Sequence, residues 1–130
     1  MSFDPRSIGK PVYEALHELK NLPDQEEVRL KEQKNQAVEL YTYLSTWGML
    51  RLKAEEYALS QEGKKQIVRS FFNCLQTIAE EPGLTGEEGL RTLKDLSTDK
   101  YLGLTSLGLA IAQEFGFWAT AVYYDITGEA

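Results

Sequence analysis

The C-terminal stretch from Asp99 to Asp125 constrains the fold most, because its apolar residues recur at steps of three and four. This spacing places them on one face of an α-helix of about 26 residues, roughly 40 Å long at 1.5 Å per residue. Ser97, Thr98 and Asp99 all suit the capping position at its start. The face predicted to point into the core comprises Leu104, Leu107, Ile111, Phe115, Trp118 and Val122. We expect the rest of the chain to pack around this helix.

A row of small residues follows the same helix at steps of four: Gly108, Ala112, Gly116 and Thr120. Small side chains at this spacing form a groove that lets another backbone approach closely. Glycine inside a helix costs roughly 0.5 to 1 kcal/mol relative to alanine, so packing should compensate for it. We therefore interpret the groove as a helix-packing site.

Turn and capping residues divide the preceding chain into further helices. Lys10-Pro11 is predicted to open the first helix, since proline tolerates the first helical position, and Pro23 ends it. Pro82-Gly83 is predicted to stop a later helix. Capping-box spacing predicts two more helix starts, at Asp24 with Glu27 and at Thr85 with Glu88.

Gly48 lies between two apolar runs that share one helical phase, from 37 to 47 and from 50 to 58. One long helix and two helices meeting near Gly48 both fit this pattern, and we favour a break or kink at Thr46 to Gly48. Predicted apolar stripes comprise Val12, Leu16, Leu19, Ala37, Leu40, Tyr41, Leu44, Trp47, Leu50, Ala54, Tyr57, Ala58, Ile67, Val68, Phe71, Leu75, Ile78 and Ala79.

These patterns predict an all-α protein. Period-two alternation is absent and β-branched residues are sparse, which argues against strands. A length of 130 residues fits one domain of ordinary size. We predict one helical domain over residues 1–130, a bundle of five to six helices, with a flexible segment at 1–10 and a tail at 126–130.

Composition and motifs argue against several functional classes. A net charge of −6 disfavours general attraction to nucleic acid or anionic membranes. The single cysteine, Cys74, excludes an internal disulfide, and the single histidine, His17, has no second imidazole with which to share a metal ion. Walker A, dinucleotide-binding and HExxH motifs are missing. We expect no enzymatic activity, no cofactor and no bound metal.

Neither a signal peptide nor an apolar run of the ~20 residues needed to cross a bilayer is present, so we expect no membrane contact and a cytoplasmic location.

Two sets of residues remain as candidates for binding. The first, chosen on charge alone, is Arg51, Lys53, Lys64, Lys65 and Arg69, which a helical hairpin would bring near one end; the set forms either a phosphate-binding site or a solvated basic rim. The second is the aromatic residues off the main stripes, Tyr43, Phe72, Phe117 and Tyr124, which form either an interface or a second buried face.

A family resemblance is found in residues 90–123, with the sequence LRTLKDLSTDKYLGLTSLGLAIAQEFGFWATAVY. Its marks are a leucine-bearing helix, a Ser-Thr-Asp cap, Tyr101 followed by Leu104-Thr105, then Leu107 to Leu109, aromatics at Phe117-Trp118, and Ala119 and Ala121. In this order the segment resembles the small α-helical subunit of type III-B CRISPR RNA-guided effector complexes, the Cmr complexes. The analogous small subunit of type I-D systems is similar too. Looser similarity extends upstream over Tyr41 to Tyr57 and Ile67 to Glu81.

The resemblance implies a noncatalytic subunit of an antiviral defence complex. Several copies would stack head to tail along the channel that holds guide RNA paired with its target, beside larger effector-complex subunits. RNA-binding in this family is not part of the packing motif, so the resemblance assigns no role to the five basic residues. Gly108 and Ala110 depart from the bulkier residues expected there. The rival interpretation is a helical adaptor or regulatory protein that acts through protein contacts alone.

Overall fold

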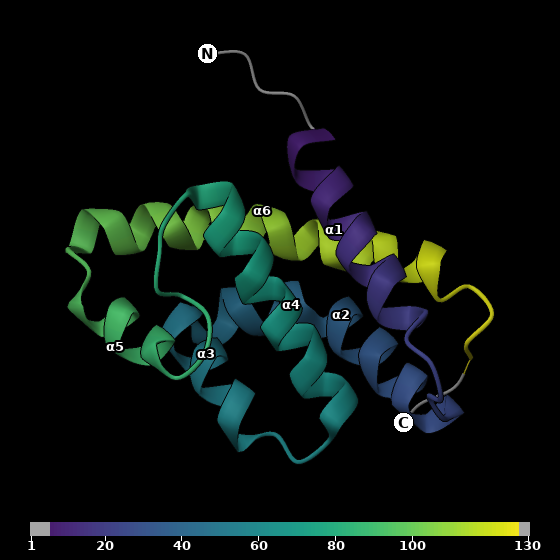
Figure 1. The fold of residues 1–130 in the computed structure, drawn as a ribbon. Helices are drawn as coiled ribbons and strands as arrows, with labels where there is room; N and C mark the ends of the chain where they lie inside the picture. The colour runs from purple at the N-terminus through teal and green to yellow at the C-terminus, as the bar shows by residue number, and fades with distance from the viewer. Residues whose placement is uncertain (1–5, 128–130) are drawn as a thin grey trace.

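The computed structural model describes residues 6–127, and every regular element within that range is a helix (Figure 1). The prediction of an all-α bundle is thereby confirmed. The six helices are α1 (Arg6–Lys20), α2 (Glu27–Trp47), α3 (Met49–Ala58), α4 (Glu62–Ala79), α5 (Glu88–Asp95) and α6 (Thr98–Val122).

The long helix α6 spans the molecule and organises the core, as predicted. It packs most extensively against α2 and α1, and α4 crosses it between them (Figure 1). Ser97 caps its start by accepting a hydrogen bond from the Lys100 amide at 3.3 Å. Leu104, Ile111, Phe115 and Val122 are buried. Leu107 and Trp118 are only half-buried, so these two predicted core positions lie at the edge.

The small-residue groove on α6 contacts α2 and α3 over most of its length. A Cβ atom at Gly108 would lie 2.5 Å from Met49 Cε, and one at Gly116 would lie 3.8 Å from the carbonyl oxygen of Val38. Ala112, between them, is fully buried. Thr120 is exposed, so the groove ends one turn earlier than predicted.

Helix α1 begins at Arg6, before the predicted start at Lys10-Pro11, and Pro11 lies inside the helix. Ile8 and Gly9 are buried in the added turn, and Gly9 lies against Trp118 of α6. This burial stabilises a turn that local sequence alone would not predict. Residues 6–10 of the segment predicted to be flexible belong to α1, its flexibility stays a prediction, and residues 1–5 lie outside the described residues.

Both predicted capping boxes are wrong. Helix α2 starts at Glu27 with Glu26 in the capping position, and α5 starts at Glu88 with Glu87 there. Neither glutamate side chain makes a capping hydrogen bond. The Thr85 amide instead donates to Gln76 Oε1 at 3.3 Å, so this loop is fixed by α4 and not by its own side chain.

Gly48 separates α2 from α3, which confirms the predicted break. Its backbone angles, φ +91° and ψ 170°, belong to a region that is essentially restricted to glycine. The break turns α3, so that Met49 and Leu52 enter the core. Trp47 is 53% exposed, and its prediction as a core residue is wrong. The remaining predicted core residues that the structure exposes are Tyr41, Ala54, Tyr57 and Ala58.

A buried polar network joins α2, α4 and the residue that follows α6. Gln33 of α2 is fully buried, and its Nε2 donates to Gln25 Oε1 at 2.7 Å and to Gln66 Oε1 at 2.8 Å. The Tyr123 hydroxyl donates to Gln33 Oε1 at 2.6 Å. Ile126, expected to belong to a tail, is also buried, because this network holds the segment after α6 against the core.

Candidate nucleic-acid interface

Lys53 is fully buried and does not belong to any surface site. Its Nζ lies 3.0 Å from Glu56 Oε1 and 4.7 Å from the centroid of the Phe72 ring. Gly89 of α5 lies against the Lys53 stem and covers it, and Glu56, one turn later on α3, neutralises the ammonium group. Lys53 is therefore removed from the predicted nucleic-acid-binding set.

The Arg51 side chain is exposed, and its guanidinium group contacts an aromatic ring. Its guanidinium carbon lies 4.8 Å from the centroid of the Trp47 ring, across the Gly48 break. Arg51 belongs to the first turn of α3, whereas Lys64 and Lys65 follow the connection from α3 to α4. The rest of α3 after Arg51, about 10 Å at 1.5 Å per residue, and the connection to α4 thus separate Arg51 from them along the chain. The predicted gathering of all five residues at one end of a hairpin is not observed.

Lys64, Lys65 and Arg69 occupy the first half of α4. Arg69 forms an exposed ion pair with Glu62, with 3.0 Å between Nη1 and Oε1. Lys64 and Lys65 are half-buried along their stems, and no acidic side chain within residues 6–127 lies within ion-pair distance of either. These two ammonium groups are therefore the members of the set that are available to bind an anion.

The structure adds basic residues of α2 to this end of α4. A Cβ atom at Gly63 would lie 2.6 Å from the Arg29 carbonyl oxygen, and the Gly63 amide donates to Glu32 Oε1 at 2.9 Å. The starts of α2 and α4 are therefore in contact. Sequence reasoning missed the α2 residues because the segment reads as a solvated charged face. The one sequence feature that could have indicated this contact is Gly63, because a glycine near a helix start lets another backbone approach closely.

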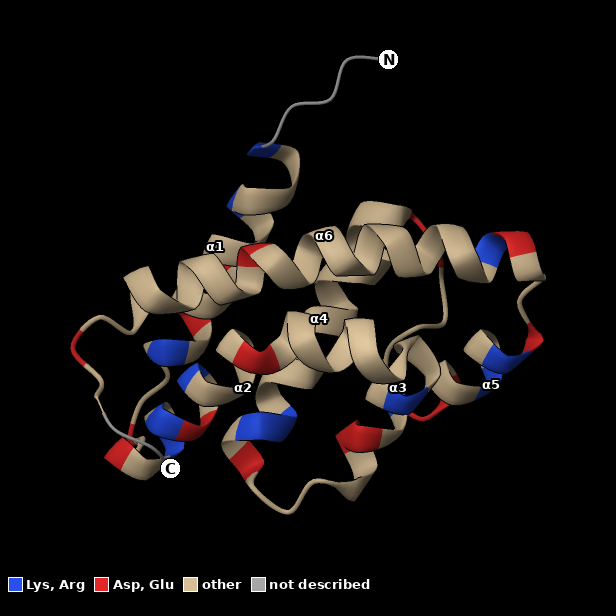
Figure 2. Cartoon of the chain, turned by 180° about the vertical axis from the view of Figure 1, so that it is seen from behind, with Lys and Arg blue, Asp and Glu red and all other residues tan. Residues whose placement is uncertain are grey.

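We call the basic residues that surround this contact the basic end: Arg29, Lys31, Lys34, Lys64 and Lys65. Figure 2 shows Lys and Arg gathered where α2 and α4 begin, with acidic residues interspersed. Glu27 lies 3.8 Å from Lys31, and Glu32 lies 3.9 Å from Arg29. Lys34 donates to the Ile126 carbonyl at 2.6 Å. Lys34, Lys64 and Lys65 thus have no carboxylate partner among the described residues, and of the three the Lys34 ammonium is already bound by a carbonyl oxygen.

The four off-stripe aromatics divide between the two predicted outcomes. Phe72 is fully buried in the core, and Tyr43 is half-buried, where burial together with nearby Glu55 raises the pKa of its hydroxyl. Phe117 and Tyr124 are 60% and 76% exposed. Phe117 belongs to α6, whereas Tyr124 lies in the turn after it, two residues before Ile126, whose carbonyl oxygen accepts from Lys34.

A surface cavity of about 410 Å³ lies between α1 and α6. Its walls include Gly9, Lys10, Tyr13, Glu114 and Trp118. The Tyr13 and Trp118 rings meet edge to face, with 5.3 Å between centroids. The lining thus combines two aromatic rings with the charged side chains of Lys10 and Glu114.

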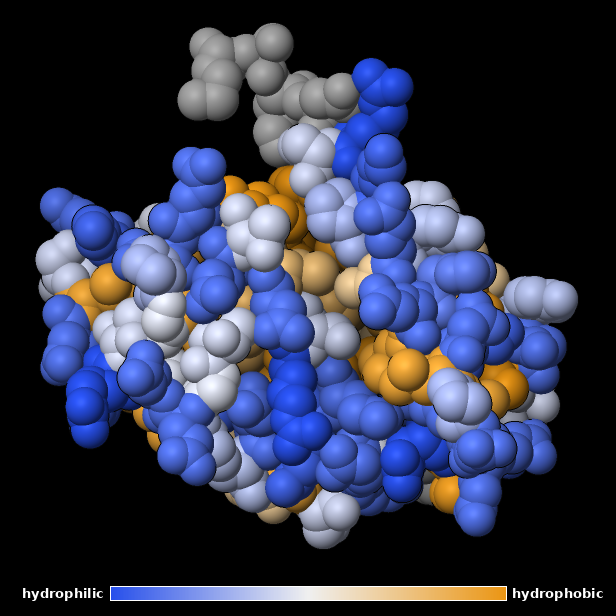
Figure 3. Space-filling view, viewed as in Figure 1, coloured by the Kyte–Doolittle hydropathy of each residue, from blue (hydrophilic) through white to orange (hydrophobic). Residues whose placement is uncertain are grey.

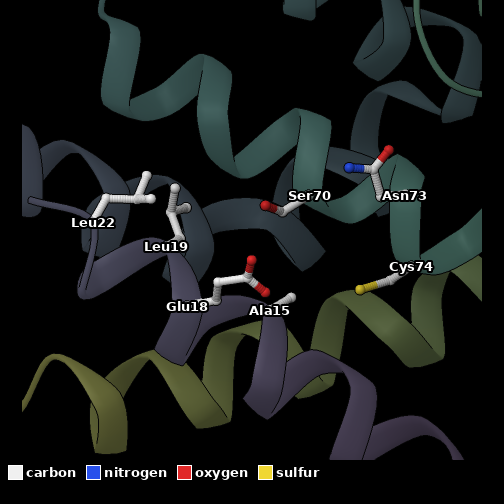
Figure 4. Close-up of a pocket in the computed structure, with 7 residues that line it drawn as sticks. All are labelled: Ala15, Glu18, Leu19, Leu22, Ser70, Asn73 and Cys74. Carbon is white, nitrogen blue, oxygen red and sulfur yellow. The ribbon is translucent and has the colours of Figure 1, made fainter.

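A second cavity, about 320 Å³, lies between α1 and α4 (Figure 4). Glu18 and Ser70 project into it from opposite sides, and Cys74 lies at one end. Burial raises the pKa of the Cys74 thiol from 9.0 to about 11, which keeps the thiol protonated and unreactive near neutral pH. The face around this cavity is mostly hydrophilic, with isolated apolar patches (Figure 3).

Among residues 6–127, no three His, Cys, Asp or Glu side chains cluster closely enough to hold a metal ion. The helices of this range are also all too short or too polar to span a membrane. Comparison of the chain with protein-family models, curated proteins and solved structures found no match.

Proposed function

We propose that this chain is a noncatalytic small subunit of a class 1 CRISPR RNA-guided effector complex, of type III-B or type I-D. The observation that carries the proposal is the segment of residues 90–123, whose resemblance to that family covers α5, the Ser97 cap and α6 as one continuous unit. The motif is therefore a packing motif that includes the principal core helix. An all-helical single domain is the architecture expected of such a subunit.

The basic end supplies the surface for nucleic acid. Lys64 and Lys65 present unpaired ammonium groups beside the α2 contact, and Arg69 follows one turn later. Phosphate contacts need positive side chains on one face and tolerate an acidic remainder, which suits a chain with a net charge of −6. In this role several copies would act in the cytoplasm, along the guide RNA paired with its target.

The test is co-expression of the tagged chain with guide RNA and the larger subunits encoded beside it. The proposal expects recovery of guide RNA and those subunits with the tag. A triple substitution, Lys64→Glu, Lys65→Glu and Arg69→Glu, should weaken binding of target-bound complex. It should also reduce the salt dependence of that binding by about one unit of slope for each phosphate interaction removed.

The matched control reverses three exposed basic residues near the opposite end of the domain, Arg91, Lys94 and Lys100. It changes net charge by the same amount but should leave affinity and salt slope nearly unchanged. Equal effects from both triple variants would reject the basic end as a specific site. Purification of the tagged chain without RNA or larger subunits would reject the proposed function itself.

A helical adaptor that binds only proteins is the second candidate, and the exposed aromatics favour it. Trp47, Phe117 and Tyr124 are each more than half exposed, and such residues are enriched at protein interfaces. Recovery of protein partners that is insensitive to ribonuclease and to the basic-end substitutions would support this candidate.

A further inference from the structure

The outward face of α6 has no charged residue in its central row. The row follows the helix at steps of four, three, four, four and three. Eighteen residues in five steps average about 3.6 per turn, the period of the α-helix, so the row runs straight along the helix. We call it the outer stripe: Leu102, Ser106, Leu109, Gln113, Phe117 and Thr120.

The outer stripe is open to solvent. Figure 2 shows α6 along its length with no other element in front of it, coloured almost entirely as uncharged residues. Leu102 is 58% exposed, Phe117 is 60% exposed, and Leu109 is half-buried. Residues beside the stripe include Gly103 and Ala110, whose small side chains permit close approach of another helix. A helix that is apolar on most sides is ordinarily covered on all of them.

The pattern of the stripe is symmetric about Gln113. Counting outward, Leu109 and Phe117 are the first residues on either side, and Ser106 and Thr120 are the second. Apolar residues therefore match apolar ones, and hydroxyl residues match hydroxyl ones. We propose that α6 packs antiparallel against α6 of a second copy, about a two-fold axis at Gln113.

In this dimer Leu109 of each copy contacts Phe117 of the other, and the two Gln113 amides meet on the axis, where each can donate to the other's oxygen. Ser106 lies opposite Thr120. A contact of this kind is isologous, with the same patch on both copies, and closes after two subunits. Two chains with a net charge of −6 repel each other in general, and the uncharged stripe lets them meet without opposing carboxylates.

The proposal is independent of the proposed function, since it concerns purified protein without RNA or other subunits. One helix pair buries less than the ~1,600 Å² of a standard interface, so we expect association at high micromolar concentration. Sedimentation equilibrium should show a mass that rises with concentration from 14.7 kDa toward twice that value. A mass that stays at 14.7 kDa over the whole concentration range would overturn the proposed dimer. The outer stripe would then be a candidate contact for a different protein.

Cross-linking tests the register in a background that carries Cys74→Ala. Gln113→Cys places two thiols on the axis, within reach of a disulfide, and should oxidise readily to a covalent dimer. Ser106→Cys alone should not, because the two copies of position 106 are separated by about 21 Å along the helices. A mixture of Ser106→Cys with Thr120→Cys should cross-link. Equal oxidation of Gln113→Cys and Ser106→Cys would overturn the register.

Charge substitution tests the central contact. Leu109→Glu or Phe117→Lys should each weaken the dimer by at least about tenfold, and mixing the two variants should restore association, because the new charges then face each other. A mixture of Leu109→Glu with Phe117→Glu should not associate. Val28→Glu, at a position that is 50% exposed on α2, is the matched control and should leave the dimer intact. Circular dichroism should show that each variant remains helical.

Discussion

Gly89 of α5 lies directly against Lys53 of α3, and a Cβ atom at position 89 would overlap Lys53 Cε. The glycine lets α5 close over the lysine stem, which places the ammonium group in the interior between Glu56 and the Phe72 ring. A residue that charge alone would assign to the surface thus holds two helices together.

Removing the partner of this lysine should be strongly destabilising. Glu56→Leu leaves the Lys53 charge buried and unpaired, and we expect a loss of about 3 to 5 kcal/mol in the free energy of unfolding, measured by urea denaturation. The double variant Lys53→Met with Glu56→Leu removes both charges and should recover most of that loss. A double variant as unstable as the single one would show that the charge imbalance is not the cause.

Gly48→Ala should destabilise the junction between α2 and α3. Its φ of +91° and ψ of 170° strain any residue with a Cβ atom, so we expect a loss of about 1 to 3 kcal/mol in thermal or urea unfolding. Gly103→Ala is the control, because that helical glycine has open space around its Cβ position. The control should stabilise by roughly 0.5 to 1 kcal/mol. Equal responses would contradict the assigned backbone geometry.

Gly108→Leu should disrupt the contact of α6 with α3. Its Cβ atom would lie 2.5 Å from Met49 Cε and 3.3 Å from Phe71 Cζ, so overpacking should remove about 1 to 3 kcal/mol of stability. Gly116→Ala fits at ordinary contact distance, 3.8 Å from the Val38 carbonyl, and should melt at or above the temperature of the parent. A stable Gly108→Leu protein would mean that Met49 can move aside freely.

Alkaline pH should weaken the fold through Cys74. The pKa of the folded thiol is about 11, above its ordinary value of 9.0, so the fold favours the neutral form. The resulting stabilisation is complete below pH 9 and is lost as pH rises toward 11, by roughly 2 to 3 kcal/mol. Urea titrations at several pH values should show the parent approaching Cys74→Ala over this window. A constant difference between the two proteins would contradict a raised pKa.

Local pattern was sufficient to predict the helices, because apolar periodicity and the turn residues around Pro23, Gly48 and Pro82 are properties of neighbouring residues. The position of α6 and its groove followed from the same spacing. Helix starts were predicted less well. Burial of Ile8 and Gly9 extends α1 on the N-terminal side of Pro11. Gly9 is covered by side chains of α6, a segment that is distant in the sequence.

The candidate site depended on tertiary contacts that periodicity does not encode. Lys53 reads as a surface lysine until Gly89 and Phe72 are placed around it. The basic end exists because Gly63 lets α4 begin against α2, which unites basic residues from two separate segments. Trp47 does not reach its predicted core position because the break at Gly48 changes the direction of the following helix.

The hydrogen bond from Tyr123 to Gln33 joins residues 90 positions apart, and it satisfies a fully buried amide. A ribosome that has delivered only α1 to α5 therefore exposes a nascent chain whose apolar faces lack α6 and whose Gln33 side-chain oxygen lacks the Tyr123 hydroxyl. The domain must complete its fold after almost the whole chain has been synthesised. Until α6 arrives, the emerging polypeptide has the exposed hydrophobic surface that molecular chaperones recognise.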